Sequence, residues 1–302
     1  MKKNRKFLII GLFVGIAIGI LLSVMYIHLT NTRGQTSELV YYATAKQLAH
    51  KKDYEGALKY INKALKMNPG SVLYLGERSW IYEAMVDDDK MIENLEEFLK
   101  VKPDDINAIS NLGRLYADSG RSREAIEILT RRIDKLPGLK RNQPSDGREG
   151  LYLSRAGAYY VTGEKKKLFQ DLARAIELDP KNIRIRTERA VMYEVLGNMD
   201  KAKIDAKFVI QNLPPPKSSV EYKCHSVAHR ILGNHKKAMK LINKAMEMSP
   251  NETRFLYERA MVYIYINDKE AARKDLKKII RDNSPETDKA EARDLLKKLE
   301  SK

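Results

Sequence analysis

The sequence has 302 residues, 43% of them hydrophobic and 32% charged, which is the composition of a folded chain rather than a disordered one. Its formal net charge is +16; four basic residues among the first six contribute four of these charges, which leaves +12 for residues 7–302. Charge of this sign attracts nucleic acid, anionic lipid and acidic proteins alike, so it selects no partner. The single cysteine, Cys224, excludes an intramolecular disulfide and a cysteine-rich metal site, and leaves both a reducing cytosol and a bacterial envelope open.

An apolar segment at residues 7–29 follows a basic tail at residues 1–6 and contains no Asp, Glu, Lys or Arg. A helix needs about 20 such residues to cross a bilayer, so we predict a single transmembrane helix. The alternative is a cleaved signal peptide, but the run exceeds the usual apolar region of about 7 to 15 residues and no Ala-x-Ala follows it. Basic residues precede the helix, whereas Arg33 and Glu38 are the charges in the ten residues after it. This asymmetry predicts a cytoplasmic N-terminus and a body on the other side of the membrane.

Three glycines recur every four residues within this segment, at Gly11, Gly15 and Gly19. Small residues at this spacing let two membrane helices approach closely, so a homodimer through this face is one hypothesis. The alternative is that the glycines are simply tolerated, since glycine is common in membrane helices. Residues 30–37 are predicted to be a linker.

The remainder of the chain is organised by regularly spaced prolines. Pro69, Pro103 and Pro137 lie 34 residues apart, as do Pro180 and Pro214. Insertions of nine and two residues account for the other intervals. With proline at position 32 of each unit, the predicted repeats are 38–71, 72–105, 106–139, 149–182, 183–216, 219–252 and 253–286.

Other positions of the unit support this register. Position 8 is small in every unit: Ala45, Ser79, Gly113, Ala156, Ala190, Ser226 and Ala260. Position 15 holds Gly120, Gly163, Gly197, Gly233 and Asn267, which are residue types that end a helix in the left-handed conformation. Position 20 is alanine in five units, and position 24 is apolar throughout. Each unit is therefore predicted to be a pair of helices joined by a turn.

Residues 62–69, 173–180 and 243–250 resemble the closing helix of a tetratricopeptide repeat, and the resemblance covers roughly residues 38–286. It implies an all-α protein: a right-handed α-solenoid of about seven helix-turn-helix repeats. The amphipathic segment 287–302 is expected to be a helix that caps the solenoid. The insertion, Lys140 to Arg148, is most simply a surface loop, and its basic character leaves a contact site open.

In this family, positions 2, 5, 9, 12 and 13 line the concave groove, and the resemblance implies the same here. The aromatic and basic residues at these positions are Tyr42, Lys46, Trp80, Arg114, Tyr160, Arg184, Lys223, Arg230, Arg254, Tyr257 and Tyr265. Glu83, Asp118 and Glu194 fall on the same face, so the predicted groove is mixed but predominantly basic. Such a lining suits an extended or helical peptide with acidic and apolar side chains, with Trp80 as the main anchor.

The sequence contains no motif for catalysis. There is no GxxxxGK loop, no GxSxG elbow and no CxxC pair, so we expect no catalytic residue and no cofactor. Cys224, His225 and His229 lie close together, and two histidines at i, i+4 have the spacing to share a metal. However, His229 occupies position 11, where five other units have tyrosine, so packing is expected rather than metal binding.

These features together predict a protein-binding scaffold or assembly factor, not an enzyme, held by a single span in a bacterial inner membrane. Two alternatives remain open. One is a binder of nucleic acid, which the predicted topology disfavours, or of anionic lipid, through the basic body. The other is an import-type receptor of an organelle, which requires the opposite orientation.

Overall fold

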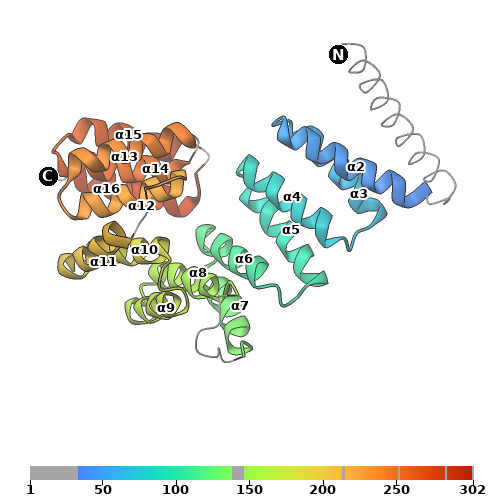
Figure 1. Ribbon diagram of the computed structural model, residues 1–302, viewed down its shortest axis with the longest axis horizontal. Helices are drawn as coiled ribbons and strands as arrows, with labels where there is room; N and C mark the ends of the chain where they lie inside the picture. Colours follow the sequence, from blue (N-terminus) through green and yellow to red (C-terminus); the bar gives the residue numbers. More distant parts are fainter. Residues whose placement is uncertain (1–32, 138–145, 213–214, 251, 283, 301–302) are drawn as a thin grey trace, which may run out of the picture. The chain divides into compact units, whose positions relative to one another are not determined.

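The computed structural model describes residues 33–137, 146–212, 215–250, 252–282 and 284–300 (Figure 1). Over these residues the chain forms fifteen α-helices and no strand. In chain order they are α2 (Arg33–His50), α3 (Tyr54–Met67), α4 (Val72–Met85), α5 (Asp88–Val101), α6 (Ile106–Asp118), α7 (Ser122–Asp134), α8 (Arg148–Val161), α9 (Lys165–Leu178), α10 (Ile183–Val195), α11 (Met199–Asn212), α12 (Ser219–Ile231), α13 (His235–Met248), α14 (Thr253–Tyr265), α15 (Lys269–Arg281) and α16 (Glu286–Glu300).

The transmembrane helix predicted at residues 7–29, including Gly11, Gly15 and Gly19, lies outside the described residues. Among the helices that are described, none combines the length and the apolar composition needed to cross a membrane. Most of the insertion at 140–148 is likewise outside them. Helix α2 begins at Arg33, so the segment predicted to be a linker at residues 30–37 is partly helical. No proline lies between Arg33 and His50 to stop the helix from extending toward its N-terminus.

The chain divides into two compact units after Asp87. The first unit contains α2, α3 and α4, and the second contains α5 to α16. The division falls between the two helices of the predicted repeat 72–105. In each of the seven predicted repeats the structure has two helices, which we call the first helix (α2, α4, α6, α8, α10, α12, α14) and the second helix (α3, α5, α7, α9, α11, α13, α15).

Side chains just before four of the first helices determine where those helices begin. Ser71, Asp105, Asn182 and Ser218 each accept a hydrogen bond from a backbone N–H in the first turn of the helix that follows. Glu221 completes a capping box with Ser218. These bonds satisfy N–H groups that have no partner within the helix, so the boundary of the repeat is specified locally.

In repeats whose two helices belong to the same unit, the helices approach each other at positions 8 and 20. Ala190 and Ala202 are both fully buried there, and Gly113, at position 8 of its repeat, is also buried and lies against Leu129 at position 24. A Cβ atom added to Gly113 would lie 2.6 Å from Leu129, so no larger residue fits there without displacing the core. Position 24 of the second helices supplies the other side of this core; Leu129, for example, is fully buried.

Every repeat turns at position 15 in the left-handed backbone conformation. The φ angles are positive at all seven positions: Lys52 63°, Val86 57°, Gly120 81°, Gly163 77°, Gly197 78°, Gly233 84° and Asn267 63°. Glycine and asparagine predict this conformation in five repeats. Lys52 and Val86 adopt it where the N–H of the next residue, Asp53 or Asp87, bonds back to Leu48 or Tyr82 at the end of the first helix. The backbone of these two turns is therefore strained, Val86 more so because it is β-branched.

A buried ion pair links the two helices of three repeats. Arg155 with Asp171, Arg189 with Asp205, and Arg259 with Asp275 form two parallel hydrogen bonds each, with N–O distances of 2.7–2.8 Å. Each arginine is at position 7 and each aspartate at position 23. Bidentate geometry fixes the rotation of one helix relative to the other, because both N–H···O bonds must be aligned at once.

Replacing Val86 by glycine is expected to stabilise the first unit by about 0.5 to 1 kcal/mol. The left-handed conformation costs an L-residue about 1–2 kcal/mol, and glycine avoids this strain. Part of the gain is offset because glycine loses more conformational entropy on folding. Little packing is lost, since Val86 is 42% exposed. The measurement is the Tm followed by circular dichroism. Val86→Thr keeps the β-branch and should leave the Tm unchanged; an equal rise in both variants would contradict the explanation.

Replacing Arg259 by methionine is expected to lower the free energy of unfolding by about 3 kcal/mol, because Asp275 is left as a buried charge without its partner. Urea denaturation of the variant measures this. The double variant Arg259→Met, Asp275→Leu should recover most of the loss. Arg174→Met, which breaks an exposed pair with Glu177, serves as the control and should cost less than about 0.5 kcal/mol. Equal losses in Arg259→Met and Arg174→Met would show that the buried pair does not stabilise the repeat.

Candidate functional site

The second unit encloses a cavity of about 280 Å³ on the inner side of its first helices. Residues of α6, α8, α10, α12 and α14 line it, together with residues of the capping helix α16. Leu168 and Leu172 of α9, both buried, contribute to its apolar wall. Val161 and Val195 also line the cavity and are each 49% exposed, so it opens to solvent beside them.

Contacts between α6 and α16 close the second unit around this cavity, although the two helices are far apart in the sequence. Asp118 of α6 accepts hydrogen bonds from Thr287 of α16 (3.3 Å) and from Arg254 of α14 (3.4 Å). Arg114 is also 2.9 Å from Asp118, and Arg254 lies 3.7 Å from Asp288. Acidic and basic side chains therefore alternate across this contact, and added salt weakens their attraction where they are exposed.

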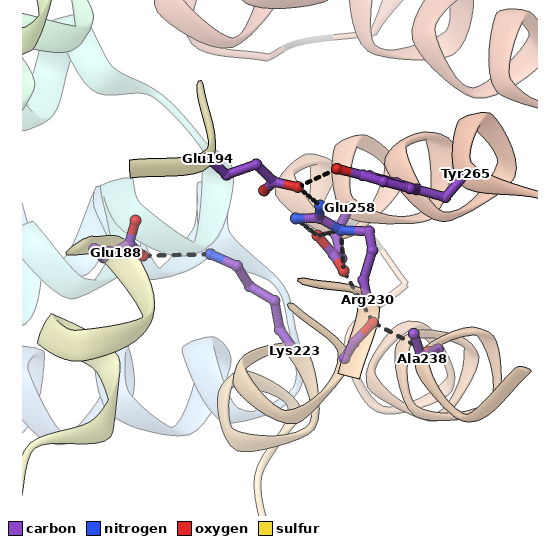
Figure 2. Close-up of polar contacts among 8 residues, drawn as sticks. Glu188, Glu194, Lys223, Arg230, Ala238, Glu258 and Tyr265 are labelled. Carbon is purple, nitrogen blue, oxygen red and sulfur yellow. Dashed lines mark hydrogen bonds and ion pairs between the residues drawn. The ribbon is translucent and has the colours of Figure 1, made fainter. Parts of the chain in front are cut away.

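The most deeply buried charged group at the cavity is Arg230 of α12, whose side chain is 2% exposed. Its guanidinium donates to both oxygens of Glu258 at 3.1 Å and to Oε1 of Glu194 (Figure 2). Tyr265 donates to the same Glu194 oxygen at 2.8 Å. Burial opposes the charge of Arg230, but Glu258 and Glu194 raise its pKa above the usual value, so it stays ionised.

A second ion pair lies on α12 and α10 at the same cavity. Lys223 is 3.5 Å from Glu188, and Figure 2 shows their side chains pointing toward each other. The negative charge of Glu188 raises the pKa of Lys223, so the pair remains charged at neutral pH. Arg184 also lines the cavity, where it is exposed.

The cavity as a whole is not basic. Five basic and six acidic residues line it, so its formal charge is negative by one when all are ionised. This differs from the predominantly basic groove expected from the sequence. The difference comes from Glu188 and Glu258 at position 6, and from Asp288 and Glu291 on the capping helix. Glu188 and Glu258 lie four residues after Arg184 and Arg254, which were predicted to line the groove. Extending the predicted groove face by one helical turn would therefore have included both glutamates.

Eight of the eleven residues predicted to line the groove belong to the second unit. Seven line the cavity, namely Arg114, Tyr160, Arg184, Lys223, Arg230, Arg254 and Tyr257. The eighth, Tyr265, reaches it through its hydrogen bond to Glu194. Most of the predicted basic residues are therefore engaged by carboxylates of the protein itself.

The remaining three predicted residues belong to the first unit. The ring of Tyr42 packs 5.2 Å from that of Tyr74, and the Lys46 ammonium lies 5.7 Å from the centre of the Tyr42 ring. Trp80 is 46% exposed and packs edge-on against Tyr54 at 6.4 Å. Trp80 is therefore held on one side and available on the other, as an anchoring residue requires.

The Cys224 cluster contributes to packing. Cys224 and His229 are buried on α12. Burial, with Lys237 and His225, lowers the pKa of His229 to about 4, so the ring is neutral at physiological pH. Within the described part of the chain, no group of three or more His, Cys, Asp or Glu side chains has the arrangement of a metal site.

Comparison with known families identifies the repeats. Models of the tetratricopeptide repeat match residues 40–71, 108–141, 225–252 and 253–281. Two curated relatives carry matching segments. The small glutamine-rich tetratricopeptide repeat-containing protein 2 of Mycosarcoma maydis is 30% identical over 86 residues, which are 28% of this chain and 24% of the relative. The mitochondrial import receptor subunit TOM70 of Rattus norvegicus is 32% identical over 95 residues, or 32% and 15% of the two chains. The chain thus spans about a quarter or less of the length of these relatives.

Solved structures agree on the fold. A tetratricopeptide repeat protein from Parabacteroides merdae superimposes with a TM-score of 0.60 at 16% identity, covering 80% of this chain and 89% of that one. PilW, described as a type IV pilus biogenesis factor, gives a TM-score of 0.52 at 18% identity over 74% and 97%. Together with the helix pairs and the common turn at position 15, these matches show that the chain contains tetratricopeptide repeats in an all-helical solenoid.

Proposed function

We propose that this chain is a membrane-anchored scaffold or assembly factor that binds a segment of a partner protein in the cavity of its second unit. Tetratricopeptide repeats mediate protein–protein interaction, and are typically scaffolds rather than enzymes. The observation that carries the proposal is the convergence of five first helices and the capping helix on one cavity, where apolar walls and fixed charges alternate. Such a mixture gives both contact area and orientation to a bound peptide.

The anchor and the location are parts of this proposal that rest on the sequence. The apolar segment 7–29 and its basic flank support a single span in a bacterial inner membrane, with the repeats on the extracytoplasmic side. A homodimer through Gly11, Gly15 and Gly19 is proposed on the same basis. PilW, a similar structure, is described as a pilus biogenesis factor, which is consistent with an assembly role in the envelope.

Two alternatives differ in what they require. TOM70 is an import receptor, and a role of that type would place the repeats on the cytosolic side. Binding of nucleic acid or anionic lipid would have to use the basic outer surface of the body, since the cavity lining, with six acidic and five basic residues, is not basic. The cavity therefore favours a protein partner.

A photoreactive phenylalanine analogue placed at Tyr160 is expected to crosslink a partner protein in living cells, because Tyr160 lines the cavity. The same analogue at Lys240, which is exposed on the second helix α13, is the matched control and should give no specific product. Mass spectrometry of the crosslinked bands identifies the partner. Identical products from both positions, or none from Tyr160, would remove the cavity as the binding site.

Alkaline phosphatase fused after Lys302 is expected to be active in bacterial cells, because the predicted topology carries the C-terminus across the membrane. A fluorescent protein that matures only in the cytoplasm should be dark at the same position. The opposite pair of results would reverse the orientation and favour the receptor alternative. Deleting the basic residues before position 7 should reduce the phosphatase signal, since they determine the orientation.

A further inference from the structure

One carboxylate at the cavity, Glu291 of the capping helix, has no hydrogen bond or ion pair with any described residue. The other five carboxylates that line the cavity each have a donor. Their partners are Arg114 and Thr287 for Asp118, Lys223 for Glu188, Arg230 and Tyr265 for Glu194, Arg230 for Glu258, and Arg254 for Asp288. Glu291 is partly buried, so its lack of a partner is costly when it is ionised.

The surroundings of Glu291 raise its pKa into the neutral range. Burial, followed by the neighbouring Asp288, raises the pKa of Glu291 to about 7; Arg254 opposes this, while Glu188 and Asp118 add to it. Tyr160 and Tyr257 line the same cavity. After burial, Glu291 is the main cause that raises the pKa of both Tyr160 and Tyr257, so its carboxylate lies near both hydroxyl groups. A negative group beside two aromatic rings is the arrangement that attracts a cation.

A second unsatisfied acceptor lies in the same wall. Glu194 directs Oε1 to Arg230 and Tyr265, as the dashed lines in Figure 2 show, whereas Oε2 is buried without a hydrogen-bond partner. The Glu194 side chain is only 6% exposed. Because Oε2 does not touch solvent, it acts through its charge rather than by direct contact. Arg230 is shared between Glu194 and Glu258, so this wall is also negative by one when both carboxylates are ionised.

Space for a side chain is available beside these groups. Gly157 lines the cavity one helical turn before Tyr160, and a Cβ atom added to it would meet nothing within 4 Å. A side chain entering beside Val161 and Val195 would meet apolar surface there and carboxylates elsewhere in the same cavity. The long aliphatic stem of lysine or arginine suits such a path, because it buries its methylene groups and keeps the charge at its tip.

We propose that this cavity binds a cationic side chain, lysine or arginine, presented by the partner protein, with its charge against Glu291 and alongside Tyr160 and Tyr257. The proposal rests on the proposed function, and it reverses the acidic partner expected from the sequence. The excess of carboxylates at the cavity is balanced when the partner's cation is bound. The bound cation also gives Glu291 and the Glu194 wall the counter-charge that they lack in the free protein.

The experiment selects peptides from a random library displayed on phage against the full-length chain in detergent micelles. Peptides that bind in the cavity are identified as those that no longer bind the Gly157→Leu variant. In this variant the leucine side chain occupies space in the cavity without changing its charge. Leucine is a better helix former than glycine, so this variant is expected to fold. Peptides of this class are expected to carry a lysine or arginine at one anchoring position, and replacing that residue by norleucine should abolish capture.

Glu291→Gln is expected to weaken these peptides about tenfold, because it removes a charge-assisted hydrogen bond. The neutral side chain is the form that burial favours, so folding is retained. Glu177→Gln on the outer helix α9 is the control and should change nothing. Capture by the natural chain should be stronger at about pH 8 than at about pH 6, because Glu291 is ionised above its pKa, and this dependence should disappear in Glu291→Gln.

Two results would overturn the proposal in distinguishable ways. Cavity peptides with aspartate or glutamate at the anchoring position would overturn the cationic partner and leave the proposed function intact. Selected peptides that all bind Gly157→Leu as well as the natural chain would show that the cavity is not the binding site, which removes the proposed function and this inference together.

Discussion

The solenoid is built on the close approach of the two helices at positions 8 and 20 in the repeats whose helices belong to one unit. Small side chains such as Ala190 and Ala202 bring the backbones together, and at Gly113 the fit leaves no room for a Cβ atom. Because this crossing recurs with the period of the repeat, successive first helices present equivalent positions on the same side. The cavity of the second unit is the consequence, since positions separated by whole repeats in the sequence converge there.

The charged groups at the cavity differ in whether they already have a partner within the protein. Arg230 is buried between Glu194 and Glu258, and Lys223 is paired with Glu188, so these cations have partners before any ligand arrives. Buried charges that are paired in this way are expensive to separate, which makes them poor candidates for capturing a peptide. Among the carboxylates that line the cavity, Glu291 has no hydrogen bond or ion pair with a described residue, so a ligand can contact it directly.

Much of the fold was predictable, because its determinants are local. The prolines, the small residues at position 8 and the glycines at position 15 identified the repeats and their turns. Lys52 and Val86 carried no such signal, since neither residue type favours the left-handed conformation that it adopts here. The ion pair between Arg189 and Asp205 was also missed. The aspartate lies sixteen residues after the arginine and becomes its partner only when the two helices pack.

Side-chain size and periodicity along the chain were enough to predict the helix pairs and the register of the repeats. The positions that face inward followed from the resemblance to tetratricopeptide repeats. Eight of the eleven predicted groove residues accordingly lie at or beside one cavity. Tertiary structure alone decided the charge of that cavity. The sign of the cavity's net charge depends on which acidic and basic groups different helices bring together, as they do for Arg254 with Asp118 and Asp288. It also depends on the capping helix, which brings Glu291 against residues more than a hundred positions earlier, and no periodicity encodes that contact.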